Sequence, residues 1–478
     1  MYCFMRDELL KVAKIKTPLL PHQQRVVDRI TQPDQPGLVV MHGLGSGKTL
    51  TSIAAQEALN QPATVVVPAS LHENYRKEVL KHTTGGSMPE LSTLQRVARG
   101  GFVPRGDTLT IDEAHRLRES STRGHQALAD IPAKKRLLLT ASPFYNHPSD
   151  ISTLINLAAG EKKLPVSRAD FSKKYIVERT HDPGLLKRIF TSQTKGTTEE
   201  LNPKTAPELK QLFGKYVDRY PGSAEGFPEV TRQTVTVPMD DHQLKVYDTM
   251  MSKAPPWVAA KVRAGLPPSK TEAKQLNAFL GAVRQVSNTT APFEGSLSRA
   301  RDPKIRAASQ ELMQVLKKDP EARAVVYSNF LAGGIEPYKQ KLDAEGVPYG
   351  EFTGEMRKNE REQMVRDYNT GKVRTLLLSS AGGEGLDLKG TRLMQILDPH
   401  WNEEKIKQVE GRGARYKSHS HLLPEKQTMT IQRFISTRPK SGLLERWGVS
   451  KPGKSVDEYL TDRAAEKERL IGQFRGLM

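Results

Sequence analysis

The sequence predicts an α/β fold with two doubly wound parallel-sheet lobes and a helical insertion between them. Three observations carry this prediction. Short β-branched and aliphatic runs alternate with helical patterns over residues 20–160, and a second such series begins at residue 322. The stretch between them, over about 160–310, is less regular and richer in Lys, Pro and Gly. Strands that alternate with helices favour parallel sheets whose ligands lie at the carboxyl ends of the strands.

The composition restricts the class of protein. A chain of 478 residues is long for one core, so two or three domains are expected. It contains 37% hydrophobic and 27% charged residues, as in soluble globular proteins, and lacks an apolar run of about 18 residues. The charged N-terminus does not resemble a signal peptide, and the single Cys3 excludes a disulfide framework. We therefore expect a soluble intracellular protein without a membrane partner.

The charge balance indicates a partner. Lys and Arg number 73 and Asp and Glu 54, so the formal net charge is +19. Neutralising phosphates with such residues releases counterions, which makes nucleic acid the leading candidate. A soluble basic protein without such a partner is the alternative.

Residues 38–51, LVVMHGLGSGKTLT, form the central motif. An apolar strand, a glycine-rich turn and a helical run follow one another, as in a phosphate-binding loop for ATP. His42 stands where the strict pattern has glycine, and a chance match in an ordinary loop is the alternative. Lys48 is expected to contact phosphate, and the Thr49 hydroxyl is expected to bind Mg²⁺. The nucleotide-binding residues expected in this loop are Gly43, Gly45, Ser46, Gly47, Lys48 and Thr49.

The residues before the loop, 20–30, have helical spacing after a proline start. Gln23 in this stretch is a candidate for reading the adenine edge through paired hydrogen bonds. An exposed glutamine at a helix start is the alternative.

Three further strands are expected over 64–68, 108–112 and 137–142. Asp112 ends the second of these strands and Glu113 follows it, in the sequence DEAH. Asp112 is expected to hold Mg²⁺, and Glu113 to orient and deprotonate the attacking water. A charged corner between strand and helix is the alternative.

In the second half, strands are expected over 322–328, 373–379 and 393–397. The second of these leads into SAGGEGLDL, whose glycines allow the backbone to approach a phosphate. QVEGRGAR contains Arg412 and Arg415 at a spacing that places both on one helix face. They are candidates for arginine fingers that neutralise charge on the γ-phosphate. A basic helix on nucleic acid or solvent is the alternative.

These ordered segments resemble superfamily-two helicases and translocases, in particular the SWI/SNF-type remodeller ATPases. The resemblance runs from about residue 20 to 471 and includes TVVVPASLHENYRKEV, LLLTASPFYNHPSDISTLINL and FPEVTRQTVTVPMDDHQLKVY. Ala141-Ser142 departs from the family's usual Gly-Thr, and Asp387 from its asparagine. GRGARYKSH is also similar to a motif of large-DNA-virus nucleoside triphosphatases, which favours a compact viral or phage-like member.

The resemblance implies a domain plan. A RecA-like ATP-binding lobe is expected over 1–235, a helical insertion over 236–305, a RecA-like helicase lobe over 306–450 and a brace helix over 451–478. It places the family's fifth motif over 381–388, with Gly385 and Asp387 near the nucleotide, and its sixth over 408–415. Ser70, Thr93 and the glycines of SAGGEG are the nucleic-acid contacts to test first.

The function expected from residues and resemblance together is a DNA-dependent ATPase motor, with ATP and Mg²⁺, that moves along duplex DNA. Two alternatives stay open: an RNA-dependent helicase and a non-enzymatic DNA-binding scaffold. A motor subunit of a replication, transcription or restriction complex is a further reading. The compartment expected is the cytoplasm of a bacterium or of a virus-infected cell, or the nucleus.

Overall fold

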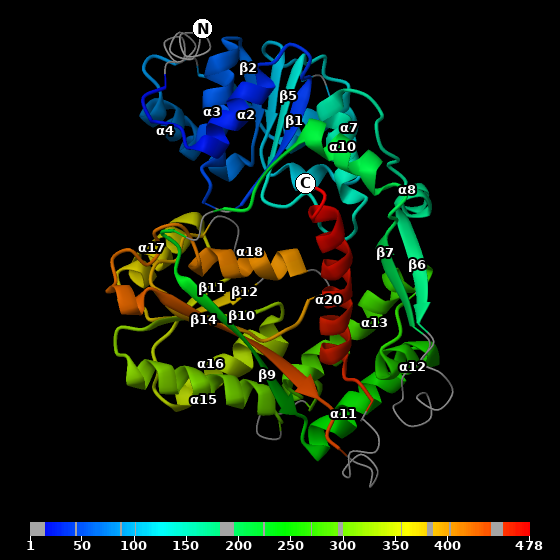
Figure 1. Ribbon diagram of the computed structural model, residues 1–478. Coiled ribbons are helices and arrows are strands. Elements are labelled where there is room, and N and C mark those ends of the chain that lie inside the picture. The colour runs from blue at the N-terminus through cyan, green and yellow to red at the C-terminus, as the bar shows by residue number, and fades with distance from the viewer. Residues whose placement is uncertain are drawn as a thin grey trace. The chain divides into compact units, whose positions relative to one another are not determined.

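The computed structural model describes residues 15–43, 45–86, 88–100, 102–181, 196–222, 225–268, 270–294, 300–354, 356–379, 386–400, 403–440 and 453–478. The chain divides into two compact units (Figure 1). Unit 1 comprises Met1–Arg179, Glu199–Ser223 and Arg469–Met478, and unit 2 comprises Thr180–Thr198 and Ala224–Glu468. Residues 236–305, expected as a helical insertion, belong to unit 2, and the expected domain boundaries stay predictions.

The core of unit 1 is a six-stranded sheet in the order β3-β2-β4-β5-β1-β8, in which every neighbouring pair is parallel. Its strands are β1 (Gly37–His42), β2 (Ala63–Val66), β3 (Glu90–Ser92), β4 (Thr108–Ile111), β5 (Lys135–Thr140) and β8 (Val217–Tyr220). The strands expected at 38, 64, 108 and 137 are confirmed, with ends shifted by one or two residues.

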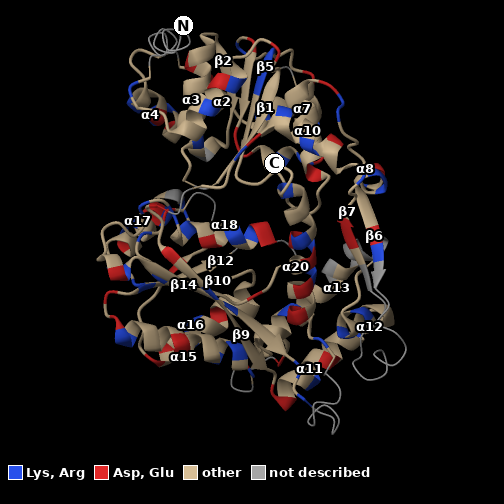
Figure 2. Cartoon of the chain, in the orientation of Figure 1, with Lys and Arg blue, Asp and Glu red and all other residues tan. Residues whose placement is uncertain are grey.

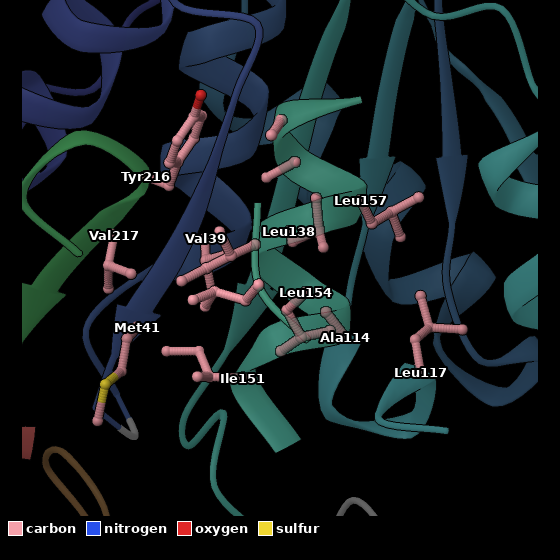
Figure 3. Packing of buried hydrophobic residues seen from close by; sticks show 14 of the residues in the cluster. Val39, Met41, Ala114, Leu117, Leu138, Ile151, Leu154, Leu157, Tyr216 and Val217 are labelled. Atoms are coloured by element: carbon pink, nitrogen blue, oxygen red, sulfur yellow. The ribbon is translucent and has the colours of Figure 1, made fainter. Parts of the chain in front are cut away.

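Alternating side chains of the central strand β1 serve both faces of this sheet. Leu38 and Val40 pack with the helices α2 (Pro21–Ile30) and α3 (Lys48–Leu59), whereas Val39 and Met41 face α7 (Asp150–Ala159) (Figure 3). Two 3-10 helices lie over Ala69–Leu71 and Ala114–Leu117. The α-helices of this unit are α2 (Pro21–Ile30), α3 (Lys48–Leu59), α4 (His72–His82), α5 (Leu94–Ala98), α6 (Arg123–Ala129), α7 (Asp150–Ala159), α8 (Arg168–Tyr175) and α10 (Ala206–Tyr216).

Unit 2 contains a second parallel six-stranded sheet, in the order β11-β12-β10-β13-β14-β9. Its strands are β9 (Glu229–Pro238), β10 (Arg323–Ser328), β11 (Gly350–Phe352), β12 (Thr375–Ser379), β13 (Thr391–Ile396) and β14 (Thr428–Thr437). The strands expected at 322, 373 and 393 are confirmed. Two parallel α/β lobes are therefore present, as the sequence predicts.

Helices cover both faces of the second sheet. On one face, α15 (Pro303–Lys318) and α16 (Glu336–Ala344) pack around Val326, and on the other, α17 (Lys358–Asn369) and α18 (Glu403–Gly413) pack around Val325. A separate apolar cluster joins α11 (Asp241–Ser252), α12 (Pro256–Ala264), α13 (Lys270–Asn288) and the start of α20 (Val456–Arg475). The remaining helices are α14 (Ala291–Glu294), a π-helix (Leu331–Ile335) and a 3-10 helix (Pro424–Lys426).

The stretch over 160–310 corrects one expectation. The sequence predicts helices and linkers there rather than sheet, yet β8 closes one edge of the first sheet and β9 one edge of the second. A two-stranded sheet of β6 (Ile176–His181) and β7 (Gly196–Leu201) also lies in this stretch. β8 has only four residues, and β9 exposes most of its side chains, so neither forms an apolar run.

Candidate nucleotide-binding and hydrolysis site

The phosphate-binding loop joins β1 to α3 and depends on its glycines. Gly45 and Gly47 have φ values of 70° and 75°, a region that favours glycine. A Cβ at Gly43 would lie 2.5 Å from the carbonyl oxygen of Pro221, so no side chain fits there. Because α3 begins at Lys48, the N–H groups of its first turn lack intrahelical acceptors and suit a phosphate.

Lys48 is the first residue of α3, and its side chain reaches back to the end of β1. Its Nζ donates hydrogen bonds to the carbonyl oxygens of His42, at 3.0 Å, and Gly43, at 3.1 Å. Thr49 follows on α3, with a half-buried side chain. The lysine and threonine expected for a phosphate-binding loop therefore stand side by side at the carboxyl edge of the sheet.

Two side chains of α2 support the loop from outside. The ring nitrogen Nε2 of His22 lies 2.9 Å from the carbonyl oxygen of Ser46, and the amide Nε2 of Gln23 donates to the same oxygen at 3.2 Å. The Oε1 of Gln23 accepts the backbone N–H of Leu20 at 2.9 Å. Gln23 is 2% exposed and both of its amide atoms are hydrogen-bonded within the protein, so in this structure it supports the loop. Its expected role at the adenine edge stays a prediction.

His42 is fixed by a buried acid on the neighbouring strand. His42 is 0% exposed, and its Nε2 lies 2.8 Å from Oδ1 of Asp218 in β8. Arg25 and Arg29 of α2 also donate to this carboxylate. Burial alone would raise the pKa of Asp218, but hydrogen bonds from His42 and Arg25 hold it well below its usual value. His42 is therefore an anchor of the loop, a role the sequence pattern does not reveal.

The acids Asp112 and Glu113 follow β4 directly. The backbone N–H of Asp112 donates to Val66 at 2.9 Å, and Glu113 adopts a left-handed conformation with φ 51°. Burial and the charge of Glu113 raise the pKa of Asp112. Burial would also raise the pKa of Glu113, but the hydrogen bond and charge of His115 lower it. Glu113 is therefore ionised at neutral pH, as a general base must be.

A hydrogen-bonded path joins these acids to the end of β5. His115 Nδ1 lies 3.2 Å from Oε2 of Glu113 and 3.5 Å from the hydroxyl of Thr140. The Thr140 hydroxyl also accepts the backbone N–H of Ser142 at 3.2 Å. The segment over 140–142 thus contacts His115, which in turn pairs with Glu113.

A pocket of about 310 Å³ lies beside Asp112 and Glu113, at the carboxyl ends of β2 and β4. Thr93 lines it, and its hydroxyl also accepts the backbone N–H of Arg96 at the start of α5. The side chain of Ser70 lies outside the described residues.

The expected helix with both arginines is only partly confirmed. Arg412 lies in the last turn of α18, but Arg415 follows the end of the helix. The Nε of Arg415 donates to the carbonyl oxygen of Gly411 at 3.0 Å, and its backbone N–H donates to the Ser418 hydroxyl at 3.2 Å. The i, i+3 spacing predicts a shared helix face but does not place the helix end, which lies at Gly413 between the two arginines.

The structure gives less information on Gly385 and Asp387, the other residues expected near the nucleotide. Asp387 is exposed, and its carbonyl oxygen accepts from the side-chain amide of Asn369. Gly385 and the other glycines of SAGGEG fall outside the described residues.

The donor set suits Mg²⁺. This ion prefers few protein ligands, usually one or two carboxylates, with phosphates and water completing its shell. Asp112 supplies a carboxylate beside a second acid, and a cation would offset both the burial and the charge of Glu113 that raise its pKa. The hydroxyl of Thr49 adds an oxygen donor. These residues fit the ion in both chemistry and charge.

Comparison with known families decides the class of protein. Residues 103–291 match the SNF2-related domain, and residues 304–417 match the helicase conserved C-terminal domain. The chain is an SNF2-type helicase of superfamily two. It is therefore an enzyme of the ATPase and helicase class that uses ATP, which sets aside the scaffold alternative.

Curated relatives of this SNF2-type helicase include viral proteins. It is 28% identical over 469 residues, 96% of each chain, to a protein of Acanthamoeba polyphaga mimivirus named as an ATP-dependent RNA helicase. A termination factor NPH-I homolog of African swine fever virus is 24% identical over 546 residues, covering 92% of this chain and 75% of the relative. DNA repair protein rhp54 of Schizosaccharomyces pombe is 24% identical over 392 residues, covering 76% and 42%.

A solved structure of the SWI2/SNF2 ATPase core of Sulfolobus solfataricus with double-stranded DNA aligns over 98% of this chain and 99% of that one. Its sequence identity is 16% and its TM-score is 0.38. In the part of the chain that the structure describes, no helix combines the length and apolar character needed to cross a bilayer.

Proposed function

We propose that this SNF2-type helicase is a DNA-stimulated ATPase that hydrolyses ATP to move along duplex DNA. The observation that carries the proposal is the carboxyl edge of the first sheet, where a phosphate-binding loop, Lys48, Asp112 and Glu113 gather. The net charge of +19 adds a general attraction for a phosphate backbone.

In the proposed reaction, the loop and the first turn of α3 bind the phosphates, and Lys48 turns from the carbonyls of β1 to the β- and γ-phosphates. Thr49 and Asp112 would hold Mg²⁺, which would neutralise charge on those phosphates. Glu113 orients the attacking water and accepts its proton on the side-chain carboxylate. Arg412 and Arg415 neutralise charge that develops on the γ-phosphate, a role worth about 10³–10⁵ in rate in other nucleotide hydrolases.

DNA would be held mainly through its phosphates, which carry little sequence information. Thr93 lies among the described residues and is a candidate for such a contact. It stands between β3 and α5 and lines the same pocket as Asp112 and Glu113. Ser70 and the glycines of SAGGEG remain candidates from the sequence.

Triplex displacement tests the proposal. A duplex carrying a labelled third strand is incubated with the protein and ATP, and release of the third strand without separation of the duplex is expected. Release must depend on ATP hydrolysis, so Glu113→Gln is the negative control. Retention of the third strand while ATP is hydrolysed rapidly would refute movement along duplex DNA.

An RNA-dependent helicase is the second candidate, and it is favoured by the name of the mimivirus relative. ATP hydrolysis measured with duplex DNA, single-stranded DNA and RNA of equal length separates the two. The DNA proposal predicts the largest stimulation by duplex DNA. Stimulation by RNA alone would replace it. The African swine fever virus relative is named as a termination factor, and a role of this chain within a larger complex is a further proposal.

A further inference from the structure

We propose that Glu410 is a positioning residue that fixes the helix bearing Arg412 and thereby orients Arg415 for ATP hydrolysis. This inference rests on the proposed function, because it takes both arginines to act on the nucleotide.

One face of α18 packs on the second sheet. Ile406, Val409, Glu410 and Gly413 recur at the spacing of a single helix face. Ile406 is 3% and Val409 1% exposed, and both join the apolar cluster under the helix. A Cβ at Gly413 would lie 2.9 Å from Cε of Met429, so the helix end approaches the sheet closely. Apolar contacts of this kind hold the helix down but discriminate weakly between small rotations or shifts.

Glu410 adds a directional contact to this face. Its side chain is 4% exposed, and its Oε2 accepts from Nε and Nη2 of Arg232, each at 3.0 Å. Its Oε1 accepts from Nη2 of Arg433, which also pairs with Glu403 at 2.7 Å. A buried carboxylate is costly unless such partners surround it, so only a narrow range of helix positions satisfies Glu410.

Arg232 and Arg433, the two partners of Glu410, come from the paired strands β9 and β14. These strands are in register along all ten residues, with Arg232 opposite Ile431. Arg433 lies two residues beyond Ile431, so both guanidinium groups leave the same face of the sheet. Side chains from two neighbouring strands thus donate hydrogen bonds to the Glu410 carboxylate. Figure 2 shows both basic and acidic residues along α18.

The position of α18 determines where Arg412 and Arg415 lie. Arg412 follows Glu410 by two residues within the same turn. The carbonyl oxygen of Glu410 accepts the backbone N–H of Ala414 at 3.0 Å, and that of Gly411 accepts Nε of Arg415 at 3.0 Å. A rotation or slide of α18 therefore moves both guanidinium groups together.

The test is ATP hydrolysis by Glu410→Gln, which keeps the shape of the side chain and removes its charge. We expect kcat to fall by about 10- to 100-fold, as when catalytic groups are misplaced by about 1 Å, with the KM for ATP changed less than about threefold. Arg232→Gln, in which the replaced side chain is 55% exposed, provides a second variant that perturbs folding less and is expected to shift kcat in the same direction. Lys407→Gln is the matched control, because it breaks partly exposed ion pairs on the same helix and should retain the parent rate.

The decisive readout is the combination with Arg415→Ala. If Glu410 acts through the arginines, Glu410→Gln lowers kcat little further when Arg415 is already absent. A merely structural role would lower kcat by the same factor in both backgrounds, which would overturn the positioning role alone. A parent rate for both Arg412→Ala and Arg415→Ala would overturn the arginine assignment and, with it, this inference.

Discussion

At the scale of single residues, the phosphate-binding loop is held by side chains distant in sequence. Asp218, 176 residues from its partner His42, fixes the end of β1, while His22 and Gln23 hold the carbonyl oxygen of Ser46. The loop, Lys48 and the DEAH acids could be predicted because their motif is local. The role of Asp218 could not, because nothing in its own tetrapeptide VDRY indicates a partner so far away.

The contacts of Gln23 lead to a prediction about nucleotide choice. If Gln23 supports the loop, Gln23→Ala should raise the KM for ATP and GTP by similar factors, because phosphate binding suffers and base recognition does not. Steady-state hydrolysis of both nucleotides measures this. A loss confined to ATP would instead assign Gln23 to the adenine base. Gln24→Ala, which removes a half-buried glutamine of the same helix whose side chain donates to Asp28 at the surface, is the control.

Buried histidines predict how stability depends on pH. Burial lowers the pKa of His42, His125 and His419 below the ordinary value. Unfolding raises these pKa values back to about 6.5, so the unfolded chain binds more protons below that pH. Stability should therefore fall as pH drops from about 7 to 5. The midpoint of thermal unfolding measures this, and its slope against pH should be shallower in His419→Gln. An equal slope would contradict the prediction.

At the scale of elements, strands with continuous apolar runs could be predicted and polar edge strands could not. β1, β5 and β12 are buried on both faces and read as unbroken aliphatic segments. β9 lies at a sheet edge and alternates Val with Thr, Arg and Gln, so its sequence reads as a linker. β14 is similarly mixed, and buried Gln432 there is held by Gln395 rather than by apolar contacts.

The C-terminal helix α20, expected from the sequence as a brace, depends on a buried ion pair at its start. Lys304 and Asp457 have side chains 0% and 1% exposed, with Nζ and Oδ2 2.6 Å apart. Lys304 also donates to Oδ1 of Asn288 at 2.7 Å, and Asp457 accepts the backbone N–H of Ser436. The helix continues from unit 2 to Arg469, where residues of unit 1 begin.

Removing the Lys304 side chain should therefore lower the free energy of unfolding substantially. We expect Lys304→Ala to destabilise the protein by about 3–5 kcal/mol, because Asp457 remains buried without its cation. The double variant Lys304→Met with Asp457→Leu should recover most of that loss. Lys339→Ala, which removes the partly exposed ion pairs of Lys339 with Glu336 and Glu351, should cost less than about 1 kcal/mol. Urea unfolding measures all three, and equal losses for Lys304→Ala and Lys339→Ala would contradict the account.

At the scale of the whole molecule, the positive charge is spread over both units rather than gathered in one tract (Figure 2). Binding through phosphates predicts a strong dependence on salt. If the protein neutralises about six phosphates or more, its affinity for duplex DNA should fall by about 10³-fold between 50 and 200 mM salt. Fluorescence anisotropy with two duplexes of unrelated sequence measures this. A weak salt dependence, or a large preference for one sequence, would contradict backbone binding.

We propose that nucleic acid stimulates ATP hydrolysis by this SNF2-type helicase. The most direct measurement is steady-state ATP hydrolysis at low salt, with and without saturating duplex DNA, for the parent protein and for Glu113→Gln. The account predicts a rate that rises at least about tenfold with DNA in the parent and stays near background in the variant. A parent rate that duplex DNA leaves unchanged would contradict it.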